Sequence, residues 1–228
     1  MRKILFLLSV FAFNVSFGQV DNYDILSKNI ESSNIQSITK FRESKKFPNG
    51  EKKFKLEFNQ QGQLISIEEY EYPMGPDNPM VMKQEINYNG EGMKVATHIN
   101  APGGSIAVDT LIYNVNGDLT QKQRIVNGQV VRTWDYTNKK KDENKKEIDD
   151  NGKLLKLIEP NGDYTTYEYD SNGNLTKELH FQEGKEHTKY TFEYDNDNLL
   201  SKMKTYLLYI GDGTTAPLSY YFDYKKNE

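Results

Sequence analysis

Three histidines carry the most versatile side-chain chemistry in the chain, and two of them lie where a hairpin turn would bring them together. They are His98, His180 and His187. Glu183-Gly184 predicts a two-residue turn, and that turn would place His180 directly opposite His187. Two imidazoles with nearby carboxylates suit a transition metal, but the sequence supplies no identifiable third and fourth ligands. His180 and His187 are therefore weak metal candidates, and tight metal binding is not expected.

Carboxylates on predicted strands are the second group with chemical potential. A pair of carboxylates about 5–10 Å apart in a cleft can hydrolyse a glycosidic bond, but the separation depends on the fold. The absence of cysteine excludes thiol catalysis, cysteine-ligated zinc and disulfides. Phosphate-loop, dinucleotide and zinc-protease motifs are also absent. The sequence thus predicts no catalytic residue and no cofactor. The carboxylates that keep a hydrolase open as an alternative are Glu68, Glu69, Glu71, Glu168 and Glu178.

A repeated unit, aromatic-x-x-x-Gly-x-Leu, must position these side chains. It reads FNQQGQL at 58–64, YNVNGDL at 113–119 and YDSNGNL at 169–175, with degenerate copies IDDNGKL at 148–154 and YDNDNLL at 194–200. The aromatic ends one strand, the polar residues turn, and the leucine opens the next strand. Glycine or asparagine suits the turn because it tolerates a left-handed backbone. The predicted turn residues are Gly62, Gly117, Gly152, Gly173 and Asn198.

Between the turns, apolar and polar residues alternate with a period of two, as in half-buried strands. Phe54, Leu56 and Phe58 show this alternation clearly. We predict an all-β domain over residues 35–228: an antiparallel meander of roughly fourteen strands in repeated hairpins, forming a twisted, rolled sheet or half-barrel. The turns also predict register, with Leu179 opposite Thr188 and Tyr167 opposite Lys177.

Aromatic residues out of phase with the predicted core set are candidates for ligand stacking. Tyr164 has the opposite parity to Tyr167 and Tyr169, and Tyr221 has the opposite parity to Phe222. Aromatic rings exposed in this way can stack on sugars, although core packing is the competing role. Tyr164 and Tyr221 are the two predicted stacking residues.

The start of the chain has the order of an export signal. Residues 1–18 combine a basic start, an apolar stretch and a small-residue cleavage context, so the mature chain is expected to begin at Gln19. Residues 19–34 are expected to form an N-terminal arm or short helix. No membrane span is expected after cleavage, and the protein is expected to be periplasmic or extracellular. The net charge of −4 argues against nucleic acid as a partner.

The segment YDSNGNLTK at 169–177 resembles the YD repeat of the Rhs and teneurin-type families, and degenerate units span most of residues 47–224. The resemblance implies continuous antiparallel sheet, wound into a hollow shell in large members and linked in some of them to carbohydrate binding. This chain is too short to close such a shell.

These features together favour an exported, non-catalytic β-repeat protein that binds a glycan or a partner protein at the cell envelope. Two alternatives remain: a carboxylate-based hydrolase of envelope polysaccharide, and a structural component of the envelope.

Overall fold

The computed structural model describes residues 33–101, 104, 106–137, 144–208 and 217–226. The predicted export signal at 1–18, and all but the last two residues of the predicted arm at 19–34, lie outside this part. The described residues form fifteen β-strands. These are β1 (Ile35–Ser44), β2 (Phe47–Phe58), β3 (Leu64–Glu71), β4 (Met80–Tyr88), β5 (Lys94–Asn100), β6 (Ile106–Tyr113), β7 (Leu119–Val126), β8 (Gln129–Asp135), β9 (Lys145–Ile148), β10 (Leu154–Ile158), β11 (Tyr164–Tyr169), β12 (Leu175–Gln182), β13 (Lys185–Tyr194), β14 (Leu200–Leu207) and β15 (Leu218–Lys226).

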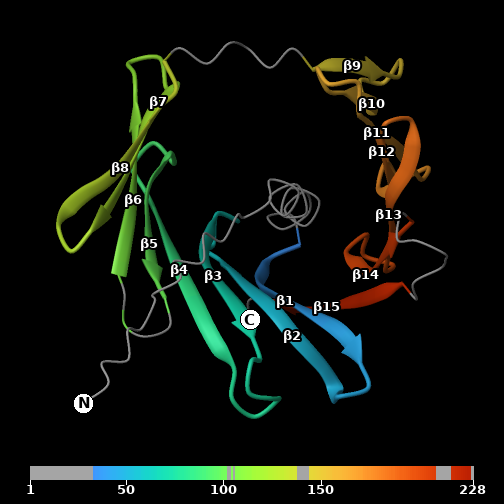
Figure 1. Cartoon of the computed structure of the whole chain (residues 1–228), viewed down its shortest axis with the longest axis horizontal. Helices are drawn as coiled ribbons and strands as arrows, with labels where there is room; N and C mark the ends of the chain where they lie inside the picture. Colours follow the sequence, from blue (N-terminus) through green and yellow to red (C-terminus); the bar gives the residue numbers. More distant parts are fainter. Residues whose placement is uncertain (1–32, 102–103, 105, 138–143, 209–216, 227–228) are drawn as a thin grey trace, which may run out of the picture.

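All fifteen strands belong to one antiparallel sheet, which confirms the predicted meander. The order is β8-β7-β6-β5-β4-β3-β2-β1-β15-β14-β13-β12-β11-β10-β9, so the first and last strands pair at the centre and β8 and β9 form the two edges. The sheet curls strongly, with β1 and β15 at the bottom of Figure 1 and the two edge strands on opposite sides of a gap above them. The sheet is open, because β8 and β9 do not pair with each other.

The Asp or Asn after each repeat aromatic builds the turn that follows it. Asp170 accepts hydrogen bonds from the backbone N–H of Asn172 (2.9 Å) and of Asn174 (2.8 Å), while the N–H of Gly173 donates to the Asp170 carbonyl at 3.0 Å. Short polar side chains that bond to their own turn stabilise it locally. The same side-chain pattern recurs at Asn59, Asn89, Asn114, Asp149 and Asp195.

The repeat tyrosine joins one hairpin to its neighbour. The Tyr194 hydroxyl donates to the carbonyl of Leu175 at 2.9 Å, and the Tyr224 hydroxyl donates to the carbonyl of Leu200 at 2.8 Å. In each case the acceptor opens a strand after the preceding repeat turn. Burial raises the pKa of both tyrosines, so the hydroxyls stay protonated as donors. Three further hydroxyls bond the same way, namely those of Tyr88, Tyr113 and Tyr169.

The turn residues adopt the left-handed backbone that the repeat predicts. The φ angles are +72° at Gly62, +83° at Gly117, +80° at Gly152, +82° at Gly173 and +59° at Asn198. A residue with a Cβ atom is strained in this region, and a β-branched residue most of all.

Replacing Gly173 with valine is expected to lower the free energy of unfolding by about 1–2 kcal/mol, from backbone strain. The nearest atoms to an added Cβ belong to the flexible Lys153 side chain, so crowding contributes little. Gly90→Val is the matched control, because Gly90 does not have a positive φ and an added Cβ would meet nothing within 4 Å. Urea unfolding measures both, and equal losses in the two variants would contradict the strain argument.

One face of the sheet carries the hydrophobic core. Directly paired residues share a face, so the pairs Ile38–Leu56, Leu56–Ile67 and Phe192–Met203 trace it across both halves of the sheet. We call it the core face. Ile38 and Leu56, beside the central seam, are 0% and 1% exposed. The most fully buried core side chains thus lie beside the pairing of the first and last strands, β1 and β15.

Bulges correct the register that the turns alone predict. Tyr169 lies opposite Leu175 as expected, but a bulge moves the next pairs, so that Tyr167 faces Glu178 rather than Lys177. A second bulge places Thr188 opposite His180 rather than Leu179. Each bulge adds one residue to one strand of the pair and increases the local twist. Beyond the bulge, the side chains of that strand lie on the opposite face from the one that the turn alone predicts.

Candidate functional site

The structure does not bring the two candidate histidines opposite each other. The Glu183-Gly184 turn forms, with both residues at positive φ, but the bulge in β13 puts Thr188 rather than His187 opposite His180. His180 instead lies beside Glu178, with its Nε2 2.5 Å from Oε1 of that carboxylate. The predicted His180–His187 pair is therefore wrong, because a two-residue turn does not fix register beyond a bulge.

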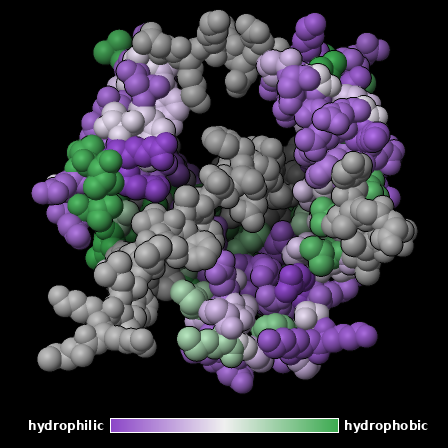
Figure 2. All heavy atoms as spheres, viewed as in Figure 1, coloured by the Kyte–Doolittle hydropathy of each residue, from purple (hydrophilic) through white to green (hydrophobic). Residues whose placement is uncertain are grey.

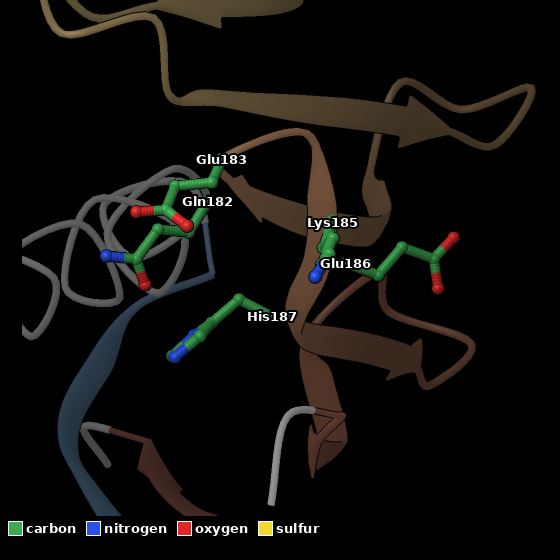
Figure 3. A pocket seen from close by; sticks show the side chains of 5 residues that line it. All are labelled: Gln182, Glu183, Lys185, Glu186 and His187. Atoms are coloured by element: carbon green, nitrogen blue, oxygen red, sulfur yellow. The ribbon is translucent and has the colours of Figure 1, made fainter.

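A shallow depression of about 200 Å³ lies at this hairpin, lined by Gln182, Glu183, Lys185, Glu186 and His187. In Figure 3 the His187 ring and Gln182 extend to one side of the hairpin, whereas Glu186 points to the other. Glu186 therefore does not flank the imidazole as a ligand would. No group of three or more His, Cys, Asp or Glu side chains in the described residues has a metal-holding arrangement.

The two tyrosines predicted to stack on a ligand already stack on phenylalanines. The Tyr164 ring lies 4.3 Å from the Phe181 ring on β12, and the Lys156 ammonium on β10 lies 4.3 Å from its centroid. Tyr221 stacks on Phe41 at 5.0 Å and donates its hydroxyl to a backbone carbonyl at 2.7 Å. Ligand stacking at Tyr164 and Tyr221 stays a prediction, on rings that already have aromatic partners.

The candidate carboxylates divide between the two faces of the sheet. Glu168 forms an ion pair with Lys177 at 2.8 Å, on the face opposite the core. Glu69 pairs with Phe54 and so lies on the core face, where burial, and then the nearby Glu71 carboxylate, raises its pKa. Hydrolysis stays an alternative that these contacts do not test.

A cluster centred on Trp134 is the most distinctive group of side chains on the core face. Trp134 lies on the edge strand β8, directly opposite Lys122 of β7, and Arg132 lies directly opposite Arg124. The cationic groups of Lys122 and Arg132 lie 4.9 Å and 4.7 Å from the indole centroid, and that of Arg124 lies 5.6 Å away. Aromatic faces attract cations at these distances. We call Lys122, Arg124, Arg132 and Trp134, together with Asp109, the Trp134 cluster.

Asp109 fixes the geometry of the cluster. Its carboxylate accepts two hydrogen bonds from Arg124, at 2.7 Å and 2.8 Å, and lies 2.8 Å from the Lys122 ammonium. The Asp109 side chain is only 6% exposed, whereas those of Lys122 and Arg124 are 28% and 39% exposed. A two-pronged arginine–carboxylate contact is strong and directional. The buried acid therefore orients two cations whose side chains still reach solvent.

The cluster carries a surplus of positive charge. One carboxylate faces the cations of Lys122, Arg124 and Arg132, so the group has a net charge of +2. Lys94 lies close enough to add to this field: burial, and then the charge of Lys122, lowers its pKa. Arg132 is exposed, and Trp134 is partly exposed on the last strand of the sheet. An aromatic ring flanked by accessible guanidinium and ammonium groups can hold an anion that also has an apolar face.

The residues on either side of the Asn127-Gly128 turn carry a partial signal for this cluster. Lys122 and Arg124 precede the Asn127-Gly128 turn, and Arg132 and Trp134 follow it, each pair two residues apart. A two-residue turn alone would put these pairs on opposite faces. A bulge between Arg124 and Ile125 moves them onto one face, as in the β12–β13 hairpin.

Comparison with known proteins finds one family model and several solved structures. The RHS Repeat model matches residues 149–181, and no curated protein matches. A porin-like protein from Bacteroides uniformis is 11% identical, with a TM-score of 0.42 over 84% of this chain and 98% of that one. The Photorhabdus luminescens Tc holotoxin pore and the TcdB2–TccC3 protein are each 14% identical, with TM-scores of 0.30 and 0.26.

The two toxin proteins are much longer than this chain. It covers 9% and 8% of their lengths, and they match 74% and 68% of it. The family match spans the turns at 149–153, 159–163 and 170–174, and each of these turns has a glycine at positive φ. In the first and third turns an aspartate, Asp149 or Asp170, also accepts backbone hydrogen bonds. Residues 149–181 therefore match the RHS Repeat model, which confirms the resemblance to YD-repeat proteins that the motif predicts.

Proposed function

We propose that this is an exported, non-catalytic β-repeat protein that binds an acidic glycan through the Trp134 cluster. The single observation that carries the proposal is the Trp134 ring with three cationic groups within 4.7–5.6 Å of its centroid, on the edge of the core face. Export is supported by the order of residues 1–18, and the repeat character by the RHS match.

The chemistry of the cluster favours an acidic sugar over a neutral one. The C–H face of a pyranose ring packs well on an indole, which supplies apolar area and a negative electrostatic face. Carboxylate or sulfate groups on the same sugar would bond to Arg132 and to the outward N–H groups of Arg124. A neutral sugar would use only the first of these interactions, and would leave the cations without a partner.

The test compares a polyuronate, polygalacturonate, with the neutral polymer dextran by isothermal titration calorimetry. The protein is expected to bind polygalacturonate and not dextran, and binding is expected to weaken as salt rises because exposed charges are screened. Trp134→Ala is expected to weaken binding by about tenfold or more, equivalent to about 1.4 kcal/mol. Arg132→Gln, which keeps the indole, is expected to weaken it as well.

Tyr164→Ala and Tyr221→Ala are the matched controls, because both remove a partly exposed aromatic ring that already stacks on a phenylalanine. Neither is expected to change the affinity. Far-ultraviolet circular dichroism checks that each variant is folded. Equal binding of the two polymers, or unchanged affinity in folded Trp134→Ala, would reject the proposal, and loss of binding in the tyrosine variants would move the site to those rings.

A further inference from the structure

The two edges of this sheet cannot pair with each other through the segment that joins them. Every neighbouring pair is antiparallel, including β1 with β15. Counting outward from β1 in both directions, β8 and β9 therefore run the same way. Parallel neighbours need a crossover of about a dozen residues or more. Only nine residues, 136–144, separate the two strands. The direction of the strands keeps the sheet open and leaves two edges.

The two edges differ in how well they are protected against pairing. Strand β9 has four residues, Lys145–Ile148, and two of them are lysines, which is a common device against edge pairing. Strand β8 has seven residues, Gln129–Asp135, and contains neither lysine nor proline. Val130 and Val131 on β8 are 54% and 57% exposed. Figure 2 shows hydrophobic atoms gathered at the left of the molecule, where the β7–β8 hairpin lies. Strand β8 is the open edge.

The hydrogen-bonding pattern identifies which backbone groups of β8 face outward. The Tyr136 N–H donates to the Thr120 carbonyl of the β7 side at 2.8 Å. Successive residues of a strand direct their N–H and C=O groups to alternate sides, so those of Trp134 and Arg132 also face β7. The amide groups of Thr133 and Asp135 therefore face away from the sheet. In the described residues no strand pairs with that side of β8.

We propose that β8 pairs antiparallel with β8 of a second copy of this chain, about a twofold axis at Thr133. Continuity of the core face across the junction allows only registers centred on a residue. Centring on Thr133 places Arg132 opposite Trp134 of the second copy, twice, and lets the two Thr133 residues exchange backbone hydrogen bonds. The Arg132 guanidinium already lies 4.7 Å from the indole centroid of its own chain. In the dimer it would also lie beside the indole of the second copy, where a second cation–π contact is favourable.

The neighbouring register is disfavoured by charge. Centring on Arg132 would oppose the two Arg132 guanidinium groups across the axis, and like charges directly opposite are destabilising. The Thr133 register instead places Val131 opposite Asp135 of the second copy, with no like-charge pair on β8. The Thr133 register thus pairs each Arg132 with the Trp134 ring of the second copy and avoids an Arg132–Arg132 pair. This dimer goes beyond the proposed function, since it needs no glycan.

Sedimentation equilibrium of the purified full chain, without any saccharide and over a wide range of concentration, tests the dimer. The wild-type mass is expected to rise towards twice the monomer value. Thr133→Pro is expected to stay monomeric, because proline removes an outward N–H while the hydrogen bonds to β7 remain, and edge strands tolerate proline in such positions. Thr133→Val is the matched control, since it keeps the N–H and is expected to dimerise as the wild type does.

Amide hydrogen exchange of the wild-type protein supplies a measurement that does not depend on the proline variant folding. The Thr133 and Asp135 amides are expected to be protected at high protein concentration and to exchange faster on dilution. A wild-type chain that is monomeric throughout would overturn the proposal, as would dimerisation of folded Thr133→Pro or exchange at these amides that is independent of concentration. Because no saccharide is present, these results are separate from the outcome of the glycan experiment.

Discussion

Replacing Leu56 with alanine is expected to lower the free energy of unfolding by about 3–5 kcal/mol, the cost of an unfilled cavity at a fully buried leucine. Leu56 is 1% exposed and lies on β2 between Ile38 and Ile67, which are 0% and 8% exposed. These strands adjoin the central seam of β1 and β15, where the two halves of the sheet are joined. The surrounding strands are held by hydrogen bonds on both sides and have little freedom to collapse into the space.

Urea unfolding measured by tryptophan and circular dichroism signals checks this expectation. Leu155→Ala on β10 is the matched control, because the Leu155 side chain is 41% exposed and its loss should cost well under 1 kcal/mol. A loss of stability at Leu56 no larger than that at Leu155 would contradict this account, because it would show that the centre of the sheet is packed no more tightly than the outer hairpins.

Replacing Lys40 with methionine is expected to raise the free energy of unfolding at pH 7 by about 2–3 kcal/mol, since a charge with a shifted pKa is removed from the core face. Lys40 pairs with Phe54 and Phe222, and its ammonium lies 4.2 Å from the Tyr220 ring centroid. No carboxylate in the described part of the chain forms an ion pair with it. Burial, and then the charge of Lys53, lowers the pKa of Lys40 to about 8.

The lowered pKa also gives the wild-type protein a specific pH dependence. Below about pH 8, Lys40 is charged in both the folded and the unfolded chain, so its burial cost is constant. Above that value the folded chain loses its proton before the unfolded one, because the unfolded lysine titrates near 10.5. The free energy of unfolding is therefore expected to rise from about pH 8 upward. The buried tyrosines oppose this trend from about pH 10, where they ionise in the unfolded chain.

Urea unfolding between about pH 7 and pH 9.5 measures the gain in stability of Lys40→Met and the rise in wild-type stability with pH. The upper limit stays below the ordinary pKa values of tyrosine and lysine, so that side chains of these types with ordinary pKa values do not titrate. Lys40→Met should reduce the rise, and the remainder would come from Lys52 and Lys94, whose pKa values burial also lowers. Lys46→Met in the exposed β1–β2 turn should leave the rise unchanged. A wild-type profile that is flat or falls over this range, or a Lys40→Met variant less stable than the wild type at pH 7, would contradict the account of a destabilising buried ammonium.

The short-range features of this protein follow from its sequence because their causes are local. Gly173 and Asn198 occupy turn positions with positive φ because glycine and asparagine tolerate that backbone conformation better than most residues. Asp170 bonds to backbone groups only two and four residues away. The alternation of Phe54, Leu56 and Phe58 with charged residues places all three on the core face. From these interactions the sequence predicts the hairpins, the single meander sheet and the RHS-like repeat.

The tertiary structure decided which side chains meet, because one extra residue in a strand exchanges the two faces beyond it. Such bulges separate His180 from His187 and bring Trp134 opposite Lys122. The turn residues alone do not predict these bulges, because a two-residue turn fixes only the pairs next to it. The pairing of β1 with β15 joins residues almost two hundred positions apart, and its antiparallel direction determines that β8 and β9 remain edges. The β1–β15 pairing is accompanied by burial of Ile38 on β1 and of Leu56 on the neighbouring β2. It is a long-range contact that no single segment of the sequence determines.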